Sequence, residues 1–391
     1  MEESSSTRQE PRTHLVRHMK KGKGAMFGTG STIPTLLLGL AMTLLCATGS
    51  GFGDAVHTKE RTVTQVASGV YVIRHRDAPS GFPNGNTTVI IGDREVLVVD
   101  SCYLASEARQ DIAQIRQWTD KPVHYLVNAH VHNDHTMVNG TYADAFPSLV
   151  IIAHPETKIM AEGYLSRWFA KSKQEMADLR LELETGKGED GKPLNDAQKT
   201  EIRKNLADQE AEVAEFPNFV PRLPNLTVEH ELDLDLGNRA LQIKYLGHGN
   251  TSGDLVVFVP KERILITGDI VVHPVPYLCS GYPAEWIDTL QHLIDLEPQI
   301  VVPGHGEVLH DTSYLIQVKL LLTTVVSAVR NLFYAQKNGL ELDQARKSVE
   351  QTIDFEALRR QFDGGDPDNF SQSNVFTRCL IRNAFYEEVL R

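Results

Sequence analysis

Short runs of β-branched and aliphatic residues, separated by polar turns, recur from Arg61 onward and predict a β-rich first part of the chain. The runs cover residues 70–73, 87–91 and 95–100. Residues 92–94 (Gly-Asp-Arg) supply a turn between the last two runs, so these are predicted to form a hairpin.

The apolar spacing changes to a helical period over residues 106–118. Two isoleucines fall on one side and three charged residues on the other: Ile112 and Ile115 against Glu107, Arg109 and Asp111. We therefore expect an amphipathic helix with its isoleucines toward the core and these charged residues outward. A short apolar run at 123–128 then predicts a buried strand.

Apolar and polar runs alternate again in the second half of the chain. Strands are predicted at residues 149–153, 226–228, 240–246, 254–259, 263–266 and 300–302, and helices at 284–296 and 314–336. Strands first, a helix, strands again and more helices indicate an α+β fold with two sheets back to back and helices outside.

The stretch 171–215 differs in character, with eight basic and twelve acidic residues. Turn-forming residues gather in its middle: Gly186, Gly188, Gly191 and Pro193. This pattern predicts two charged helices joined by a turn. A solvated helical insertion over one edge of the site is preferred to a regulatory or partner-binding arm.

The first 55 residues have the order of a secretory signal. Basic, apolar and small residues follow one another there: Lys20, Lys21 and Lys23, then the runs 36–47 and 48–55. The apolar run is too short to span a bilayer comfortably. We expect signal cleavage and a periplasmic or secreted product without stable membrane association, with an uncleaved anchor as the alternative. A catalytic domain at 56–310 and a C-terminal helical extension at 311–391 would remain.

Composition narrows the range of partners. The 391-residue chain is 41% hydrophobic, which is ordinary for a globular protein, and has a formal charge of −12. Residues 1–55 hold six Lys/Arg and four Asp/Glu, so the rest of the chain carries −14. An acidic body repels phosphate backbones, so we expect a small-molecule substrate rather than nucleic acid. Oligomeric state is not readable from the sequence.

Three cysteines lie beyond the signal segment: Cys102, Cys279 and Cys379. Their spacing shows no paired metal motif. They allow at most one disulfide, whose pairing stays open.

Three imidazoles and a carboxylate fall within six residues just after the 123–128 strand: His130, His132, Asp134 and His135. Side chains at the end of a strand project from a rigid base, which a metal site requires. Neutral imidazole and carboxylate are ligands that suit Zn²⁺. The spacing therefore predicts a metal site rather than a solvated loop.

Three further candidate ligands also follow predicted strands: His248, Asp269 and His305. Glycines beside each of them allow tight turns and close backbone approach. One cleft could collect all seven side chains, which are too many for a single tetrahedral Zn²⁺. Two metals sharing a bridge fit better, and Asp269 can bridge because a carboxylate has two oxygens.

The motif His130-x-His132-x-Asp134-His135, followed by His248, Asp269 and His305, resembles that of the metallo-β-lactamase superfamily over about residues 61–310. The resemblance implies an αββα four-layer sandwich with a dinuclear metal site at one edge of the sheets. By position, it assigns His130, His132 and His248 to the first metal. It assigns Asp134, His135 and His305 to the second, with Asp269 bridging. Asp100 matches the family's aspartate behind the ligands, with a plain turn residue as the alternative.

In such a site, water shared by two Zn²⁺ ions becomes hydroxide near neutral pH and attacks a carbonyl carbon, with Asp134 orienting it or accepting its proton. An exported enzyme would meet β-lactam-like cyclic amides. Asp269, however, departs from most true β-lactamases of the family. It is similar to glyoxalase II thioesterases and acyl-homoserine lactonases, which are mostly intracellular.

Opening of a lactam or lactone ring therefore ranks first, and glyoxalase II-like thioester hydrolysis second. The acidic charge disfavours a phosphodiesterase or ribonuclease. Among other classes, di-iron redox proteins of this fold usually carry Glu where His132 stands and need a flavin partner, for which no motif is evident. A non-catalytic metal-binding protein is the remaining alternative. Three side chains are candidate substrate contacts, each with a structural alternative: His154, His273 and Tyr282.

Overall fold

The computed structural model describes residues 60–336, 339–362 and 373–390. The chain divides into two units after residue 48, and all described residues belong to the second unit. The predicted signal segment, residues 1–55, lies outside the described residues.

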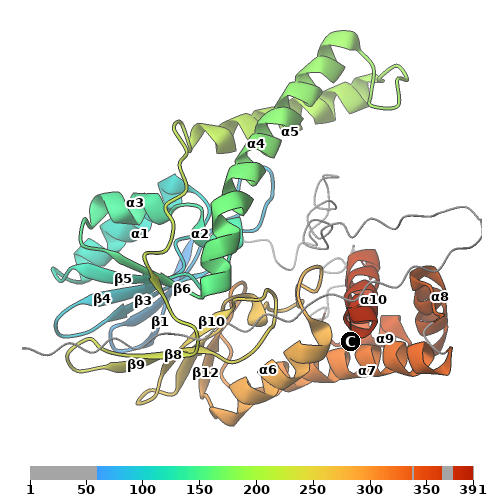
Figure 1. Ribbon diagram of the computed structural model, residues 1–391. Coiled ribbons are helices and arrows are strands. Elements are labelled where there is room, and N and C mark those ends of the chain that lie inside the picture. The colour runs from blue at the N-terminus through green and yellow to red at the C-terminus, as the bar shows by residue number, and fades with distance from the viewer. Residues whose placement is uncertain (1–59, 337–338, 363–372, 391) are drawn as a thin grey trace, which may run out of the picture. The chain divides into compact units, whose positions relative to one another are not determined.

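Two sheets form the centre of the fold (Figure 1). The first has seven strands in chain order: β1 (Thr62–Ala67), β2 (Val70–Arg74), β3 (Thr87–Ile91), β4 (Val96–Val99), β5 (Val123–Val127), β6 (Val150–Ala153) and β7 (Leu226–Thr227). The second runs β12 (Ile300–Val302), β11 (Ile264–Ile266), β10 (Leu255–Val259), β9 (Ala240–Tyr245) and β8 (Glu231–Asp235). Neighbouring strands are parallel from β4 to β7 and between β11 and β12, and antiparallel elsewhere. The predicted hairpin is present as β3 and β4.

Both faces of the central strands are buried because helices cover the outer sides of the sheets. Leu97 of β4 lies in the core between the sheets, and its neighbour Val98 packs toward helix α1 (Ala105–Trp118). Successive side chains of a strand alternate between faces, so one apolar run serves two cores. Helices α3 (Asn139–Ala145) and α6 (Pro283–Asp295) lie on the outer sides of the first and second sheet. The predicted αββα sandwich is confirmed.

The outward orientation predicted for the acids of α1 is wrong at two positions. Glu107 and Asp111 are 1% and 0% exposed. Arg76 Nε lies 2.9 Å from Glu107 Oε1, and Arg61 Nη2 lies 2.9 Å from Asp111 Oδ1. Burial of a carboxylate is tolerated where such partners replace its water. These partners come from distant parts of the chain, so helical periodicity could not reveal them.

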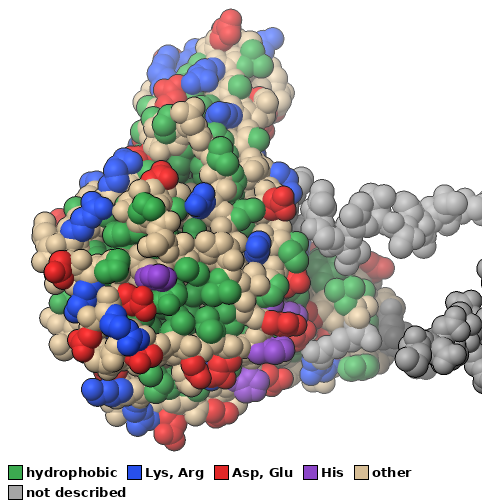
Figure 2. Space-filling view, turned by 60° about the vertical axis from the view of Figure 1, so that its left-hand side comes forward, with side chains coloured by type: hydrophobic (Ala, Val, Ile, Leu, Met, Phe, Trp, Pro, Cys, Tyr) green, Lys and Arg blue, Asp and Glu red, His purple; other side chains and the backbone are tan. Residues whose placement is uncertain are grey.

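The charged insertion forms an arm of two helices, α4 (Pro155–Thr185) and α5 (Asp196–Ala214). The first helix begins earlier than residue 171 because Ala161 and Leu165 at its base pack into the outer core of the first sheet. Gly186, with φ of 68°, ends this helix. The arm rises clear of the sheets, with Lys, Arg, Asp and Glu on its surface (Figures 1 and 2).

The chain after β12 is helical, as predicted: α7 (Ser313–Ala335), α8 (Leu342–Thr352), α9 (Phe355–Arg359) and α10 (Ser373–Leu390). Among the described helices, α7 alone is long and apolar enough to cross a membrane. Its Leu321, Leu322 and Val325 fill a core shared with α6 and α10. This core accounts for the buried apolar residues of α7, whereas Ile316 and Leu320 are exposed.

Candidate metal centre

Six of the seven predicted ligands come together at one end of the two sheets. The first sheet supplies four, from the loop after β5 and the short helix α2 (Asn133–Thr136): His130, His132, Asp134 and His135. The second sheet supplies Asp269, from the 3-10 turn η1 (Gly268–Ile270) after β11, and His305, from the turn after β12. The site therefore exists only where the two sheets are packed together.

The donor atoms form two groups that share Asp269. One group contains His130, His132 and Asp269, and the other contains Asp134, His135, Asp269 and His305, with the atoms of each group within 4.8 Å of one another. Asp269 Oδ2 lies 3.5 Å from His130 Nε2. Asp269 Oδ1 lies instead 3.3 Å from His135 Nε2 and 3.5 Å from His305 Nε2. The two oxygens of one carboxylate thus face different groups, as a bridge between two cations requires.

The close approach of these donors fits divalent cations. His130 Nε2 lies 3.0 Å from His132 Nδ1, and His135 Nε2 lies 3.3 Å from His305 Nε2. Among the described residues, the buried Asp269 Oδ1 has no hydrogen-bond partner. Imidazole lone pairs and a carboxylate oxygen that converge in this way are the ligand types preferred by Zn²⁺.

Asp100 lies behind His135. Its Oδ2 accepts a hydrogen bond from His135 Nδ1 at 2.8 Å, and its Oδ1 accepts one from the Ala129 amide at 2.7 Å. A proton fixed on Nδ1 leaves the Nε2 lone pair of His135 facing the centre. Asp100 also has a φ of 63°. The structure therefore gives it a contact with a predicted ligand as well as a turn conformation.

Burial and the neighbouring charges shift the pKa values of the candidate ligands in opposite directions. Burial works to raise the pKa of the Asp134 carboxyl, but His135 and His305 hold it well below its usual range. Burial opposes charge on His135 too, yet Asp134 and Asp269 raise its pKa well above normal. In His130 burial prevails and lowers the pKa well below normal. In the metal-free protein Asp134 and Asp269 are therefore ionised and His135 carries a second ring proton, which a bound cation would displace from Nε2.

A family model described as the metallo-beta-lactamase superfamily matches residues 80–305, more than half of the chain. The chain belongs to the metallo-β-lactamase superfamily. Its buried clusters of His and Asp are typical of a metal site in this fold.

Two curated relatives match in part. A linear primary-alkylsulfatase of Pseudomonas sp. is 24% identical over 219 residues, 54% of this chain and 39% of the relative. A metallo-beta-lactamase type 2 of Bacillus cereus is 32% identical over 82 residues, 19% of this chain and 32% of the relative. The chain thus spans less than half of either relative. A solved stereoselective inverting sec-alkylsulfatase of Pseudomonas sp. superposes with a TM-score of 0.58 at 15% identity, over 84% of this chain and 50% of that one, which shows the shared fold.

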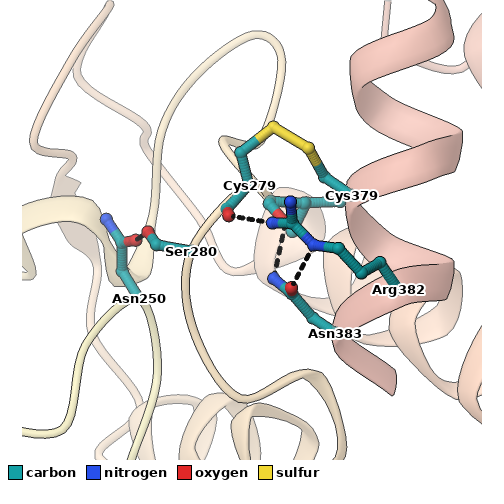
Figure 3. The surroundings of a disulfide bond; sticks show 7 residues. Asn250, Cys279, Ser280, Cys379, Arg382 and Asn383 are labelled. Carbon is teal, nitrogen blue, oxygen red and sulfur yellow. Dashed lines mark hydrogen bonds between the residues drawn. A yellow bond between two sulfur atoms is a disulfide. The ribbon is translucent and has the colours of Figure 1, made fainter. Parts of the chain in front are cut away.

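The structure does not bring the seventh predicted ligand into either donor group. His248 Nδ1 lies 2.7 Å from Glu285 Oε2, the imidazole stacks on Tyr282 at 4.5 Å, and the side chain is 31% exposed. The superfamily motif indicates a histidine in this loop but does not show which way the side chain turns. Asn250, two residues further on, is fully buried, with its Oδ1 accepting from the Ser280 hydroxyl (Figure 3) and its Nδ2 unpartnered among the described residues.

The three candidate substrate contacts already have structural neighbours. His154 Nδ1 accepts from the Glu156 amide at the start of α4, and its ring stacks on Tyr245 at 4.4 Å. The amide of His273 donates to the His305 carbonyl at 3.1 Å, and its ring lies 4.9 Å from that of Tyr314. Tyr282 stacks on His248, as described above. Of these three, His273 contacts a residue of the two donor groups, through the backbone of His305.

Two tyrosines absent from the sequence-based predictions lie beside the metal centre. The rings of Tyr164 and Tyr277 are 6.1 and 6.3 Å from the ring of His132, and all three side chains are partly exposed. Nothing in the spacing of Tyr164, on α4, or Tyr277, in a loop, could link them to His132. The centre is therefore open on the side where these aromatic rings gather.

The loop that carries Tyr277 is fastened to the C-terminal helix. A disulfide joins Cys279 to Cys379 of α10, which settles the pairing that the sequence left open (Figure 3). Arg382 Nη2 donates to the Cys279 carbonyl at 2.8 Å, and Asn383 Nδ2 donates to the Leu278 carbonyl at 3.2 Å. Helix α10 thus helps to position one wall of the site.

Proposed function

We propose that the protein is an exported dinuclear zinc hydrolase of small molecules that opens a β-lactam or lactone ring. The observation that carries the dinuclear assignment is Asp269, whose two oxygens face the two donor groups. Zinc ions held there would supply a hydroxide nucleophile and Lewis acidity near neutral pH. His130 and His132 would hold one ion, and Asp134, His135 and His305 the other, with Asp269 between them.

The protein's own groups would orient the reaction. Asp134 Oδ2 lies 2.8 Å from His305 Nε2, and its low pKa keeps the carboxylate ionised and able to orient water or accept its proton. His130 is fully buried whereas His132 is partly exposed, so a substrate would approach from the His132 side. Tyr164 and Tyr277 would flank it there and favour substrates with an apolar or aromatic group.

Two features support export. The order of basic, apolar and small residues in 1–55 is that of a secretory signal. The disulfide between Cys279 and Cys379 is of a kind that persists in oxidising compartments such as the periplasm.

The net charge of −12 favours a small molecule over nucleic acid as the substrate.

Sulfate-ester hydrolysis is a second candidate. The relative named a linear primary-alkylsulfatase aligns with 54% of this chain, a larger share than the metallo-beta-lactamase relative covers. Flanking tyrosines would also accommodate an alkyl chain. Thioester hydrolysis remains a third candidate because the same nucleophile could attack that carbonyl.

The test is hydrolysis of four probes by the zinc-loaded chain from about Val56 onward: a chromogenic cephalosporin, an acyl-homoserine lactone, S-lactoylglutathione and a primary alkyl sulfate. Metal content is measured on the same sample by mass spectrometry, with Asp269→Asn as the matched variant. We expect about two zinc ions per chain and turnover of the cephalosporin or the lactone that is lost on chelation. Turnover of the alkyl sulfate alone would favour the second candidate. Bound iron in place of zinc, or turnover that survives chelation, would refute the proposal.

A further inference from the structure

A three-residue segment just before β3, residues 84–86, touches both sides of the second donor group. It leads into the first sheet, yet it contacts the turn after β12 in the second sheet. Its contacts lead to His135 on one side and to the turn of His305 on the other.

Gly85 lies directly against a predicted ligand. A Cβ atom at this position would fall 2.7 Å from His135 Cε1 and 2.8 Å from the Asp134 carbonyl oxygen. Such distances are too short for carbon contacts, so a side chain here would displace the imidazole. The backbone of Gly85 therefore forms the wall behind His135.

Asn86 holds the turn that carries His305. Its amide donates to the Gly304 carbonyl at 2.7 Å. Its side-chain Nδ2 donates to the Pro303 carbonyl at 2.9 Å and to the Gly306 carbonyl at 3.0 Å. Asn86 is only 5% exposed, so water cannot readily replace these bonds. The three acceptor carbonyls belong to residues just before and just after His305. The hydrogen bonds therefore fix the backbone on both sides of this histidine.

The segment is itself anchored from behind. His75 Nδ1 donates to the Gly85 carbonyl at 2.7 Å, and His75 Nε2 lies 2.7 Å from Asp111 Oδ2. Arg61 pairs with the other oxygen of Asp111 at 2.9 Å. His75 and Asp111 are buried, which limits movement of this chain of contacts. The burial of Asp111, which contradicted the sequence-based orientation, is explained by this anchor.

We propose that Asn86 is a positioning residue for the second metal ion, setting the distance between His305 and His135. Without its carboxamide, residue 86 would hold the 303–306 turn by one hydrogen bond instead of three. Among the described residues, the hydrogen bonds of Asn86 reach this turn and not the loop of His130 and His132. This inference rests on the proposed dinuclear site, and its consequence is selective loss of one of two ions.

The test compares zinc binding by the full chain with that of Asn86→Asp, which keeps the shape but replaces two N–H donors by an oxygen facing two carbonyls. Equilibrium dialysis against buffered zinc and the absorption spectrum of the cobalt-substituted protein report each site without any substrate. The control is Asn225→Asp, since Asn225 Nδ2 also donates to a distant carbonyl, that of Leu149 near the start of β6. We expect the second ion to bind roughly 10- to 100-fold more weakly in Asn86→Asp, as when an outer partner of a ligand is lost, and normally in the control.

If a folded Asn86→Asp variant binds both ions as tightly as the native protein does, the inference is overturned and the proposed function stays intact. Absence of metal from the native protein would overturn both. If circular dichroism shows Asn86→Asp to be unfolded, Asn86→Ser, which keeps one donor and adds no charge, is measured instead. A smaller but selective loss of the second ion is then expected, and unchanged binding again overturns the inference. Restoration of kcat by excess zinc would support positioning over a direct role in the reaction.

Discussion

Replacing His248 by Ala should leave both metal ions in place, in contrast to replacing His132. The His248 imidazole pairs with Glu285 in a partly exposed position, with side-chain exposures of 31% and 53%. Exposed pairs of this kind contribute about 0–1 kcal/mol, so His248→Ala should lower the free energy of unfolding by no more than that. The His248 side chain belongs to neither donor group. The zinc affinity of His248→Ala should therefore differ from that of the native protein by less than about threefold, or roughly 0.7 kcal/mol.

His132→Ala removes one of two imidazoles from the first donor group. Its effect on that ion should exceed the roughly 10- to 100-fold loss that follows removal of an outer partner of a ligand. Zinc stoichiometry and affinity are measured for both variants by competition with a chromogenic chelator. Unfolding in urea provides the stability comparison. If His248→Ala loses an ion as readily as His132→Ala, His248 turns inward when metal binds, and the reasoning from its contact with Glu285 is refuted.

Three further changes test other parts of the structure. Replacing Cys279 and Cys379 by Ser opens a loop with a sequence separation of 100. The free energy of unfolding, measured by urea titration, should fall by about 4–5 kcal/mol. A loss below about 1 kcal/mol would contradict the loop-entropy argument. Asp100→Asn weakens the acceptor for His135 Nδ1 and should lower zinc affinity by roughly 10- to 100-fold in chelator competition, whereas unchanged affinity would show that Asp100 is only a turn residue. Burial raises the pKa of Asp254 to about 7, so the metal-free folded state retains a proton that the unfolded state releases above about pH 4. Unfolding free energy should therefore fall by about 2–3 kcal/mol between pH 5 and pH 8, and by clearly less in Asp254→Asn; identical pH profiles would count against this titration.

The sequence was most informative where neighbouring residues carry the signal. Four ligand candidates within six residues, at the end of an apolar run, indicated a metal site, and the structure brings all four together: His130, His132, Asp134 and His135. Strand and helix periods were likewise sufficient for the layers of the fold. These features depend on local spacing, which a single chain displays directly.

The errors arose where a side chain's partner is distant in sequence. Glu107 and Asp111 were placed outward because the cations that pair with them are more than 30 residues away. The assignment of His248 as a ligand stays a prediction, because the loop motif does not reveal the contact with Glu285 that the structure shows. Strand β8 was not predicted, since its alternating acids are poor strand formers, although Leu232 packs toward the core between the sheets.

The two-helix arm also offers a place where the chain could be split into two fragments. A break in the connection between α4 and α5 would leave His130 to His135 on one fragment and Asp269 with His305 on the other. Neither fragment would hold a complete donor group. The contacts of α4 with α5, including Arg180 with Glu210 at 2.7 Å, and the pairing of β6 with β7 would guide the fragments together. Fragment complementation should therefore depend on zinc, and the divided chain could report metal concentration through recovered turnover.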